Sequence, residues 1–274
     1  MQARLTIDGR EIAVDLSHPA DLALELDFSG PQPRHFGAPC ASSRPYETPD
    51  LSFRGSVERG SSCNCELITL IPHCNGTHTE CAGHLTRERL DAWRIAPVGL
   101  LPAVLLSVVP EAPGDEGSDP VPLPGDRLIT RRALAQAWPS RVPFTPRAVV
   151  IRTLPNSPEK RVRDYTGQTP PYLSQEAAMA LVARDVLHLV VDVPSIDRAH
   201  DEGRLTGHSL FFGLPSGSTQ LAAATRASAT ITELAFIPDT IADGAYLLGL
   251  QLPALDGDAV PSRPLLYAVT EHTA

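Results

Sequence analysis

The most informative part of this chain is residues 73–84, which read His73-Cys74-Asn75-Gly76-Thr77-His78-Thr79-Glu80-Cys81-Ala82-Gly83-His84. This short segment holds three histidines, a carboxylate and two thiols, although the whole chain contains only 9 histidines. Imidazole and carboxylate groups together are typical ligands of zinc, manganese and iron. The segment therefore predicts a metal site. The alternative interpretation is a polar loop whose histidines are solvated or bonded to the backbone.

The spacing within the segment indicates how these side chains would meet. In an extended chain, side chains two residues apart point to the same face. The residues that would share one face are Cys74, Gly76, His78 and Glu80. A short turn at residues 82–83 would then bring His84 back to the same pocket.

The composition is that of an acidic globular protein. The 274 residues are 42% apolar and carry a formal net charge of −9, and a chain of this length can bury a sizeable core. The acid excess argues against nucleic-acid binding, which needs a basic face. No apolar run approaches the roughly 18 residues of a membrane span, and the first residues lack the apolar stretch of a signal peptide. We therefore expect a cytoplasmic protein with neither nucleic-acid nor membrane partners.

The cysteines agree with a reducing compartment. There are five of them, an odd number, at Cys40, Cys63, Cys65, Cys74 and Cys81. A secreted disulfide scaffold usually has an even number in a much shorter chain. We expect reduced thiols, and we interpret Cys63-x-Cys65 as two strand thiols rather than as a metal or redox pair.

The hydrophobic pattern predicts an α/β protein with more strand than helix. A hairpin is expected at residues 4–15 with its turn at Asp8-Gly9, followed by a long ordered arm at residues 19–49. Thr130 and Ser174 are expected to cap two helices, which would end near Trp138 and Arg184. Apolar runs predict strands at residues 65–71, 101–109, 148–152, 186–193, 229–237, 246–252 and 264–269. No linker divides the chain, so we expect a single domain spanning residues 1–274.

Gly76-Thr77-His78-x-Glu80 followed by His84 resembles the signature of the cyclase or kynurenine formamidase family of metal-dependent hydrolases, His-x-Gly-Thr-His-x-Asp-x-Pro-x-His. Further segments are similar to this family in the same order along the chain, at residues 14–19, 150–153, 172–178, 191–197 and 243–246. The resemblance implies a single domain with a swivelling β/β/α fold and a mixed sheet core. It also implies a homo-oligomer, as a dimer or a tetramer.

The resemblance implies roles for individual residues. His78 and Glu80 match two metal ligands of the family, and His84 matches its general base or acid. His208 and Glu233 resemble a histidine and a glutamate ligand that the family supplies nearer the C-terminus. The cofactor implied is Zn²⁺ or Mn²⁺, with one or two ions per chain.

Three features depart from the family pattern. The first histidine of the signature aligns with Cys74, whereas His73 lies one place further away. Either the Cys74 thiolate is a ligand, or a bulge at Asn75 turns His73 inward, and we favour His73 because Asn75-Gly76 suits an extra residue. Glu80 replaces an aspartate, which lengthens the side chain by a methylene, and residues 213–218 resemble an inserted loop.

Other histidines and aromatic residues carry weaker signals. His18 and His35 lie in the N-terminal arm, where they either line a substrate pocket or are structural. His188 is expected to be a core histidine because its neighbours are apolar, and His200 is expected on a solvated face. The residues that either contact an aromatic substrate or pack in the core are Trp93, Phe211 and Phe212.

These features predict a metal-dependent hydrolase that cleaves an amide C–N bond, in a formamide as an arylformamidase does or in a cyclic amide. The metal would activate water, and His84 would take the proton and pass it to the leaving nitrogen. The chain lacks a Gly-x-Ser-x-Gly elbow and a phosphate loop, which argues against a serine hydrolase or a nucleotide enzyme. The alternatives are a lactone hydrolase or cyclase of secondary metabolism and a non-catalytic binding protein that has retained the fold.

Overall fold

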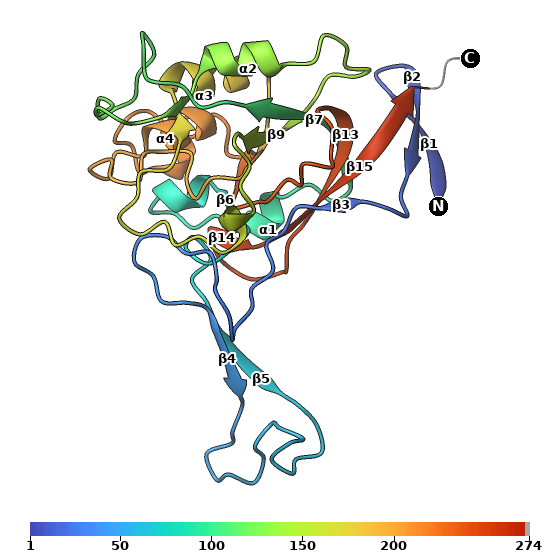
Figure 1. Cartoon of the computed structure of the whole chain (residues 1–274), viewed down its shortest axis with the longest axis vertical. Coiled ribbons are helices and arrows are strands. Elements are labelled where there is room, and N and C mark those ends of the chain that lie inside the picture. The colour runs from blue at the N-terminus through green and yellow to red at the C-terminus, as the bar shows by residue number, and fades with distance from the viewer. Residues whose placement is uncertain (272–274) are drawn as a thin grey trace.

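The computed structural model describes residues 1–271, and strands dominate its regular structure (Figure 1). The strands are β1 (Gln2–Ile7), β2 (Arg10–Asp15), β3 (Ala20–Asp21), β4 (Ser42–Pro45), β5 (Glu66–Thr69), β6 (His78–Cys81), β7 (Leu100–Val108), β8 (Leu128–Ile129), β9 (Ala148–Thr153), β10 (Tyr172–Leu173), β11 (His188–Val191), β12 (Thr230–Glu233), β13 (Gly244–Gln251), β14 (Ala259–Pro261) and β15 (Arg263–Glu271). The α-helices are α1 (Ala92–Ile95), α2 (Arg131–Ala137), α3 (Gln175–Ala183) and α4 (Thr206–Phe212). Short 3₁₀ turns are η1 (Ala82–Leu85), η2 (Pro158–Arg161) and η3 (Leu221–Ala223).

One large mixed sheet forms the framework of the protein. Its strand order is β1-β2-β15-β13-β7-β9-β11-β12-β6-β14, and β3 pairs with β15. The central strands β7, β9, β11 and β12 run parallel to one another, whereas β6 and β14 are antiparallel to their neighbours. This is the α/β fold with a mixed sheet core that the sequence predicted.

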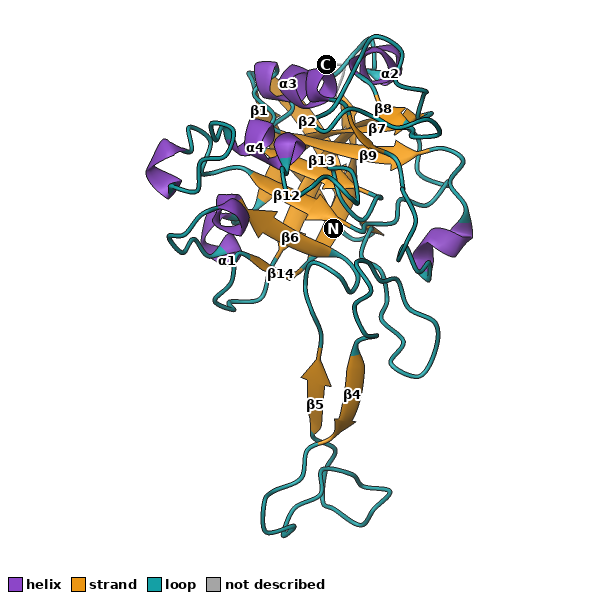
Figure 2. Cartoon of the chain, turned by 90° about the vertical axis from the view of Figure 1, so that its left-hand side faces the viewer, coloured by secondary structure: helices purple, strands orange, loops and turns teal. Residues whose placement is uncertain are grey.

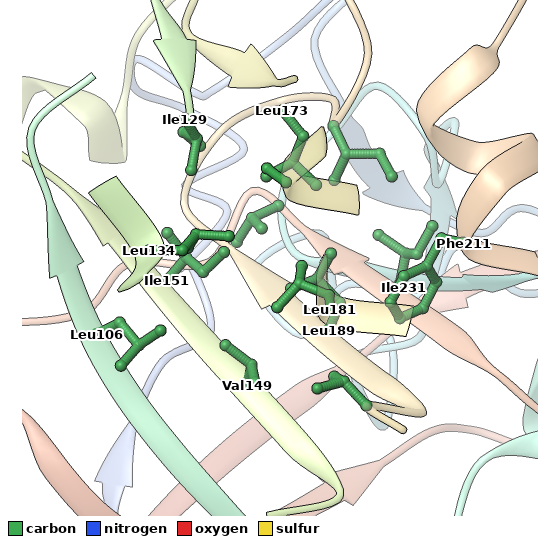
Figure 3. Packing of buried hydrophobic residues seen from close by; sticks show 14 of the residues in the cluster. Leu106, Ile129, Leu134, Val149, Ile151, Leu173, Leu181, Leu189, Phe211 and Ile231 are labelled. Atoms are coloured by element: carbon green, nitrogen blue, oxygen red, sulfur yellow. The ribbon is translucent and has the colours of Figure 1, made fainter. Parts of the chain in front are cut away.

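The central strands are covered on both faces. All six residues of β9 and all four of β11 are buried, as expected for β-branched strands in a parallel sheet. Helices α2, α3 and α4 lie on one face, where Leu134, Leu181 and Phe211 share a cluster with Val149 and Ile151. Figure 3 shows Leu134 beside Ile151 and Phe211 beside Ile231. The opposite face carries a second cluster, which includes Leu105, Val150, Val190, Leu248 and Leu266.

The two predicted helix starts are confirmed. The Thr130 hydroxyl accepts a hydrogen bond from Ala133 N at 3.0 Å, and the Ser174 hydroxyl accepts one from Ala177 N at 3.0 Å. Each hydroxyl satisfies a backbone N–H that the first helical turn leaves unpaired. Helix α4 was not predicted, and its capping differs, because Leu205 at its N-terminus has a left-handed backbone and makes no side-chain cap.

Two strand predictions were wrong in extent. The strand expected at residues 229–237 ends at Glu233, because Leu234 adopts a φ of 52° and turns the chain away. The strand expected at residues 65–71 exists only as β5, which pairs with β4 in an arm that projects from the body (Figure 2). All four residues of β5 are exposed, so this strand is not part of the core.

None of the helices in residues 1–271 combines the length and the apolar character that a bilayer crossing requires.

Burial, together with the charges of Arg147 and Arg226, lowers the pKa of His188 to about 4, so this residue makes stability depend on pH. The unfolded chain binds a proton below about pH 6.5, whereas folded His188 stays neutral down to about pH 4. Stability present above pH 6.5 is therefore lost as the pH falls toward 4, by about 3 kcal/mol. We predict that His188→Gln removes this loss, as measured by urea unfolding of metal-free protein at pH 7 and pH 4.

The control for this prediction is His18→Gln, because the His18 side chain is exposed at the surface. The stability of His18→Gln should fall between pH 7 and pH 4 by as much as that of the wild type. If His188→Gln also follows the wild type, burial of His188 does not control the pH dependence.

Candidate metal centre

His73 is positioned by a tight turn rather than by an extended strand. Cys74 N and Asn75 N both donate to Ile71 O at 2.9 Å, and the Asn75 side-chain oxygen accepts from Ile71 N at 2.8 Å. Gly76 has a φ of +80°, and a Cβ atom there would lie 2.9 Å from Leu26 Cδ2. The predicted alternation of side chains from Cys74 onward is therefore wrong, since the extended segment begins only at His78.

The β6–β12 pairing places the next three residues. In the antiparallel register, Glu233 lies directly opposite His78, and Glu80 is two residues further along β6. The Thr77 hydroxyl holds this edge of the sheet in place, since it accepts from Leu24 N at 2.8 Å and donates to Leu234 O at 2.6 Å. After β6 the chain turns through η1, as the sequence predicted at residues 82–83, and His84 lies in this turn.

Glu80 lies at the centre of the cluster, and its side chain is completely buried. Its Oε1 is 2.8 Å from His208 Nε2, and its Oε2 is 3.1 Å from His73 Nδ1 and 3.9 Å from His84 Nε2. Glu233 completes the cluster, 3.5 Å from His78 Nε2 and 3.5 Å from His208 Nε2. The structure thus brings together all six residues that the sequence selected, namely His73, His78, Glu80, His84, His208 and Glu233.

The donor atoms of this cluster fit a divalent metal ion. His78 Nε2, His208 Nε2 and both Glu80 oxygens are buried, and within residues 1–271 no group makes a well-aligned hydrogen bond to them. Leaving such atoms unpaired is costly unless a cation binds them. Three sets of residues each place three ligand atoms within 4.8 Å of one another. They are His73/His78/Glu80, Glu80/His84/His208 and His73/His84/Asp258. Nitrogen and carboxylate oxygen in this mixture suit zinc or manganese.

Two aspartates outside the predicted set orient the histidines. Asp197 accepts hydrogen bonds from Gly207 N at 2.6 Å and His208 N at 3.0 Å, and its Oδ2 is 2.6 Å from His208 Nδ1. Asp258 Oδ2 is 2.8 Å from His73 Nε2 and 3.2 Å from His84 Nδ1. Asp197 lies in a segment that resembles the family, whereas Asp258 has no sequence signal because it is far from the motif along the chain.

At His73, Glu80 and His208, attraction between opposite charges affects the pKa more than burial does. Burial alone would lower the pKa of His73, yet hydrogen bonding to Asp258 and the charge of Glu80 raise it to about 10. Burial likewise opposes the charged form of Glu80, but His208 and His84 hold its pKa well below the usual range. Hydrogen bonds from His73 and His84 also depress the pKa of Asp258. The carboxylates are therefore anionic and available to a metal ion.

Other residues from the sequence analysis lie elsewhere. Phe211 and Phe212 are core residues, and Trp93 lines a separate cavity beside Tyr267. The Cys74 thiol belongs to none of the ligand sets found in the described part of the chain, and burial raises its pKa. The remaining residues outside the cluster are His18, Cys63, Cys65, His188 and His200.

We predict that metal content distinguishes the two candidates for the first ligand. His73→Ala and His78→Ala should each lower the zinc or manganese bound per chain, because each removes a nitrogen next to Glu80 or Glu233. Cys74→Ser should retain the wild-type content. Mass spectrometry of untagged protein purified without chelators measures this, and loss of metal only in Cys74→Ser would assign the ligand to the thiol.

Comparisons with known proteins identify the family and the fold of the chain. The family model described as "putative cyclase" matches residues 14–198, which is more than half of the chain. A predicted metal-dependent hydrolase from Bacillus stearothermophilus is 18% identical, with a TM-score of 0.57 over 91% of this chain and 98% of that one. Isatin hydrolase A from Labrenzia aggregata is 14% identical, with a TM-score of 0.61 over 92% of this chain and 93% of that one. No curated protein sequence matches the chain. With its motif, its fold and this match, the chain belongs to the putative cyclase family.

Proposed function

We propose that this chain is a cytoplasmic metal-dependent hydrolase that cleaves an amide C–N bond, in a cyclic amide or a formamide. The observation that carries the proposal is the convergence of Glu80 with four histidines, whose buried nitrogen and oxygen atoms lie close together without well-aligned hydrogen bonds. The fold supports it as well, since similar structures are described as a metal-dependent hydrolase and as isatin hydrolases. Isatin contains a cyclic amide, which favours that substrate class.

The side chains divide into those that hold the ion and one that moves a proton. His73, His78, Glu80, His208 and Glu233 would hold one or two Zn²⁺ or Mn²⁺ ions. A bound ion supplies Lewis acidity, which polarises a carbonyl group and lowers the pKa of water. His84 accepts the proton of the attacking water and delivers it to the leaving nitrogen. Asp258 fixes the His84 ring through Nδ1, so that Nε2 faces the cluster.

The exposure of the cluster is compatible with a reaction on an external substrate. Glu80, His78 and His208 are buried, whereas the side chains of His84 and Asp258 are 26% and 42% exposed. The proton-transfer residue thus lies on the side from which a small molecule arrives. This asymmetry favours an enzyme over a binding protein that has only retained the fold. A lactone would fit the same chemistry and is the second substrate class to test.

We predict that metal-loaded wild-type protein hydrolyses at least one of three probes: isatin, N-formylaniline or an aryl lactone. His84→Ala should keep its metal and lose about 10²–10⁴-fold in kcat, the usual contribution of a general base. His188→Gln should match the wild type. Metal content by mass spectrometry and hydrolysis followed by absorbance are the two measurements. If His84→Ala is as active as the wild type, His84 is not the proton-transfer residue. If the wild type takes up no metal, the alternative of a non-catalytic binding protein is favoured.

We also propose that the chain forms a homo-oligomer, a dimer or a tetramer, in which the β4–β5 arm contacts a second copy. The arm exposes apolar side chains at Tyr46, Leu67 and Ile68. A two-stranded hairpin that packs against nothing is marginally stable in water, and exposed apolar patches often mark contact surfaces. A second copy would bury this surface in a symmetric contact.

Light scattering tests this prediction. The wild type should have at least twice the chain mass of 29.4 kDa, and Leu67→Lys combined with Ile68→Lys should shift it toward the monomer. The matched control is Met179→Lys, since Met179 is also exposed but lies on α3, away from the arm. A monomeric wild type would contradict the proposal.

A further inference from the structure

His35 is a buried histidine whose ring makes no hydrogen bond that would explain its burial. Its residue is 2% exposed, yet neither Nδ1 nor Nε2 has a hydrogen-bond partner anywhere in the described chain. A neutral imidazole offers one donor and one acceptor, and a buried polar group left unpaired costs about 1–3 kcal/mol. His188 shows the usual solution, since its ring hydrogen-bonds to the Thr230 hydroxyl at 2.9 Å.

The backbone around His35 is held from two sides. His35 N donates to Cys74 O at 3.1 Å, which ties it to the turn that carries His73. The preceding residue, Arg34, donates to Arg163 O and accepts from Tyr165 N, and its guanidinium pairs with Asp164 at 2.6 Å. The backbone at His35 is therefore anchored on both sides, and the residue is buried.

The position of His35 adjoins the segment that carries the first ligand, because Cys74, which accepts the His35 N–H, is the chain neighbour of His73. Burial lowers the pKa of His35, while the charge of Glu233 raises it and His200 and His78 lower it. Burial dominates, so the ring is neutral near pH 7 and keeps one N–H donor and one free acceptor nitrogen.

We propose that His35 contacts the substrate, and that its ring hydrogen-bonds to an uncharged polar group next to the scissile amide bond. The inference rests on the proposed function for the identity of the substrate. Its own basis is the pair of unpaired nitrogens in a buried ring, on a residue whose backbone is hydrogen-bonded to the turn that carries His73. A second carbonyl oxygen or an amide N–H of the substrate would supply the partner that the fold does not.

The distinguishing variant is His35→Leu, which removes both ring nitrogens and keeps an apolar side chain. If the nitrogens are unpaired in the free protein, this variant should unfold at the same temperature as the wild type or a higher one. Its kcat/KM should nevertheless fall about tenfold, mainly through KM, because a buried hydrogen bond to the substrate is worth about that factor. His35→Gln retains a donor and an acceptor and should recover part of the loss.

The measurements are melting temperature, metal content, steady-state kinetics and the melting shift caused by isatin on metal-loaded protein. The control is His188→Gln, a buried histidine away from the cluster, which should keep wild-type kinetics. His35→Leu with unchanged melting, unchanged metal and wild-type kcat/KM would overturn the inference, since the ring would then bind only water. His35→Leu that melts far below the wild type and regains activity on cooling would also overturn it, because the role would be structural.

The outcomes separate this inference from the proposed function. If the wild type is shifted by isatin but hydrolyses none of the probes, and His35→Leu loses the shift, the hydrolase proposal fails and the contact stands. If the wild type hydrolyses a probe and His35→Leu does so equally well, the hydrolase stands and the contact fails. If isatin neither shifts the wild type nor is hydrolysed, and the other probes are inert, both proposals fail.

Discussion

The site depends on one interaction, the attraction between the buried carboxylate of Glu80 and the histidines that surround it. A charge removed from water is tolerated only when opposite charge or a metal ion compensates it. Histidines from three separate places, the turn at His73, η1 at His84 and α4 at His208, approach its two oxygens. The strand register of β6, the turn after it and the position of α4 are therefore all linked to one side chain.

The histidines reach Glu80 in the correct orientation because acidic groups hold their opposite edges. Asp197 binds His208 at Nδ1 and leaves Nε2 for the cluster, and Asp258 does the same for His84. Such carboxylates fix the ring and raise its basicity, which strengthens it as a ligand or a base. Asp197 also accepts backbone N–H groups at the start of α4. This replaces the capping side chain that Leu205 cannot provide.

The buried residues of the cluster and the residues that solvent can reach lie in different parts of the site. His78, Glu80 and Glu233 are buried where the β6–β12 register fixes them, and His208 is buried on α4, where Asp197 holds its ring. His73, His84 and Asp258 lie at the partly exposed rim. His35 belongs to neither group, since it is buried yet enters from the N-terminal segment. The buried ligand atoms are thus held by the framework, whereas His73, His84 and Asp258 remain partly open to solvent.

The sequence by itself determined the composition of the centre. Spacing within residues 73–84 and the resemblance of His208 and Glu233 to known ligands identified six residues that the fold brings together. Helix caps at Thr130 and Ser174 were also readable, because a cap depends on residues three places apart. The same local rules failed at residues 74–77, where a turn closed by Ile71 and Asn75 replaces an extended strand.

Only the tertiary structure decided which side chains surround those six residues. Asp258 meets His73 and His84 because β14 pairs with the edge of β6, a contact between distant parts of the chain. His35 lies next to the turn that carries His73 because the N-terminal segment binds to both Cys74 and residues 163–165. A local sequence pattern identifies functional residues that lie close together along the chain. Partners joined by strand pairing and long-range backbone hydrogen bonds leave no such pattern, since their meeting depends on the whole fold.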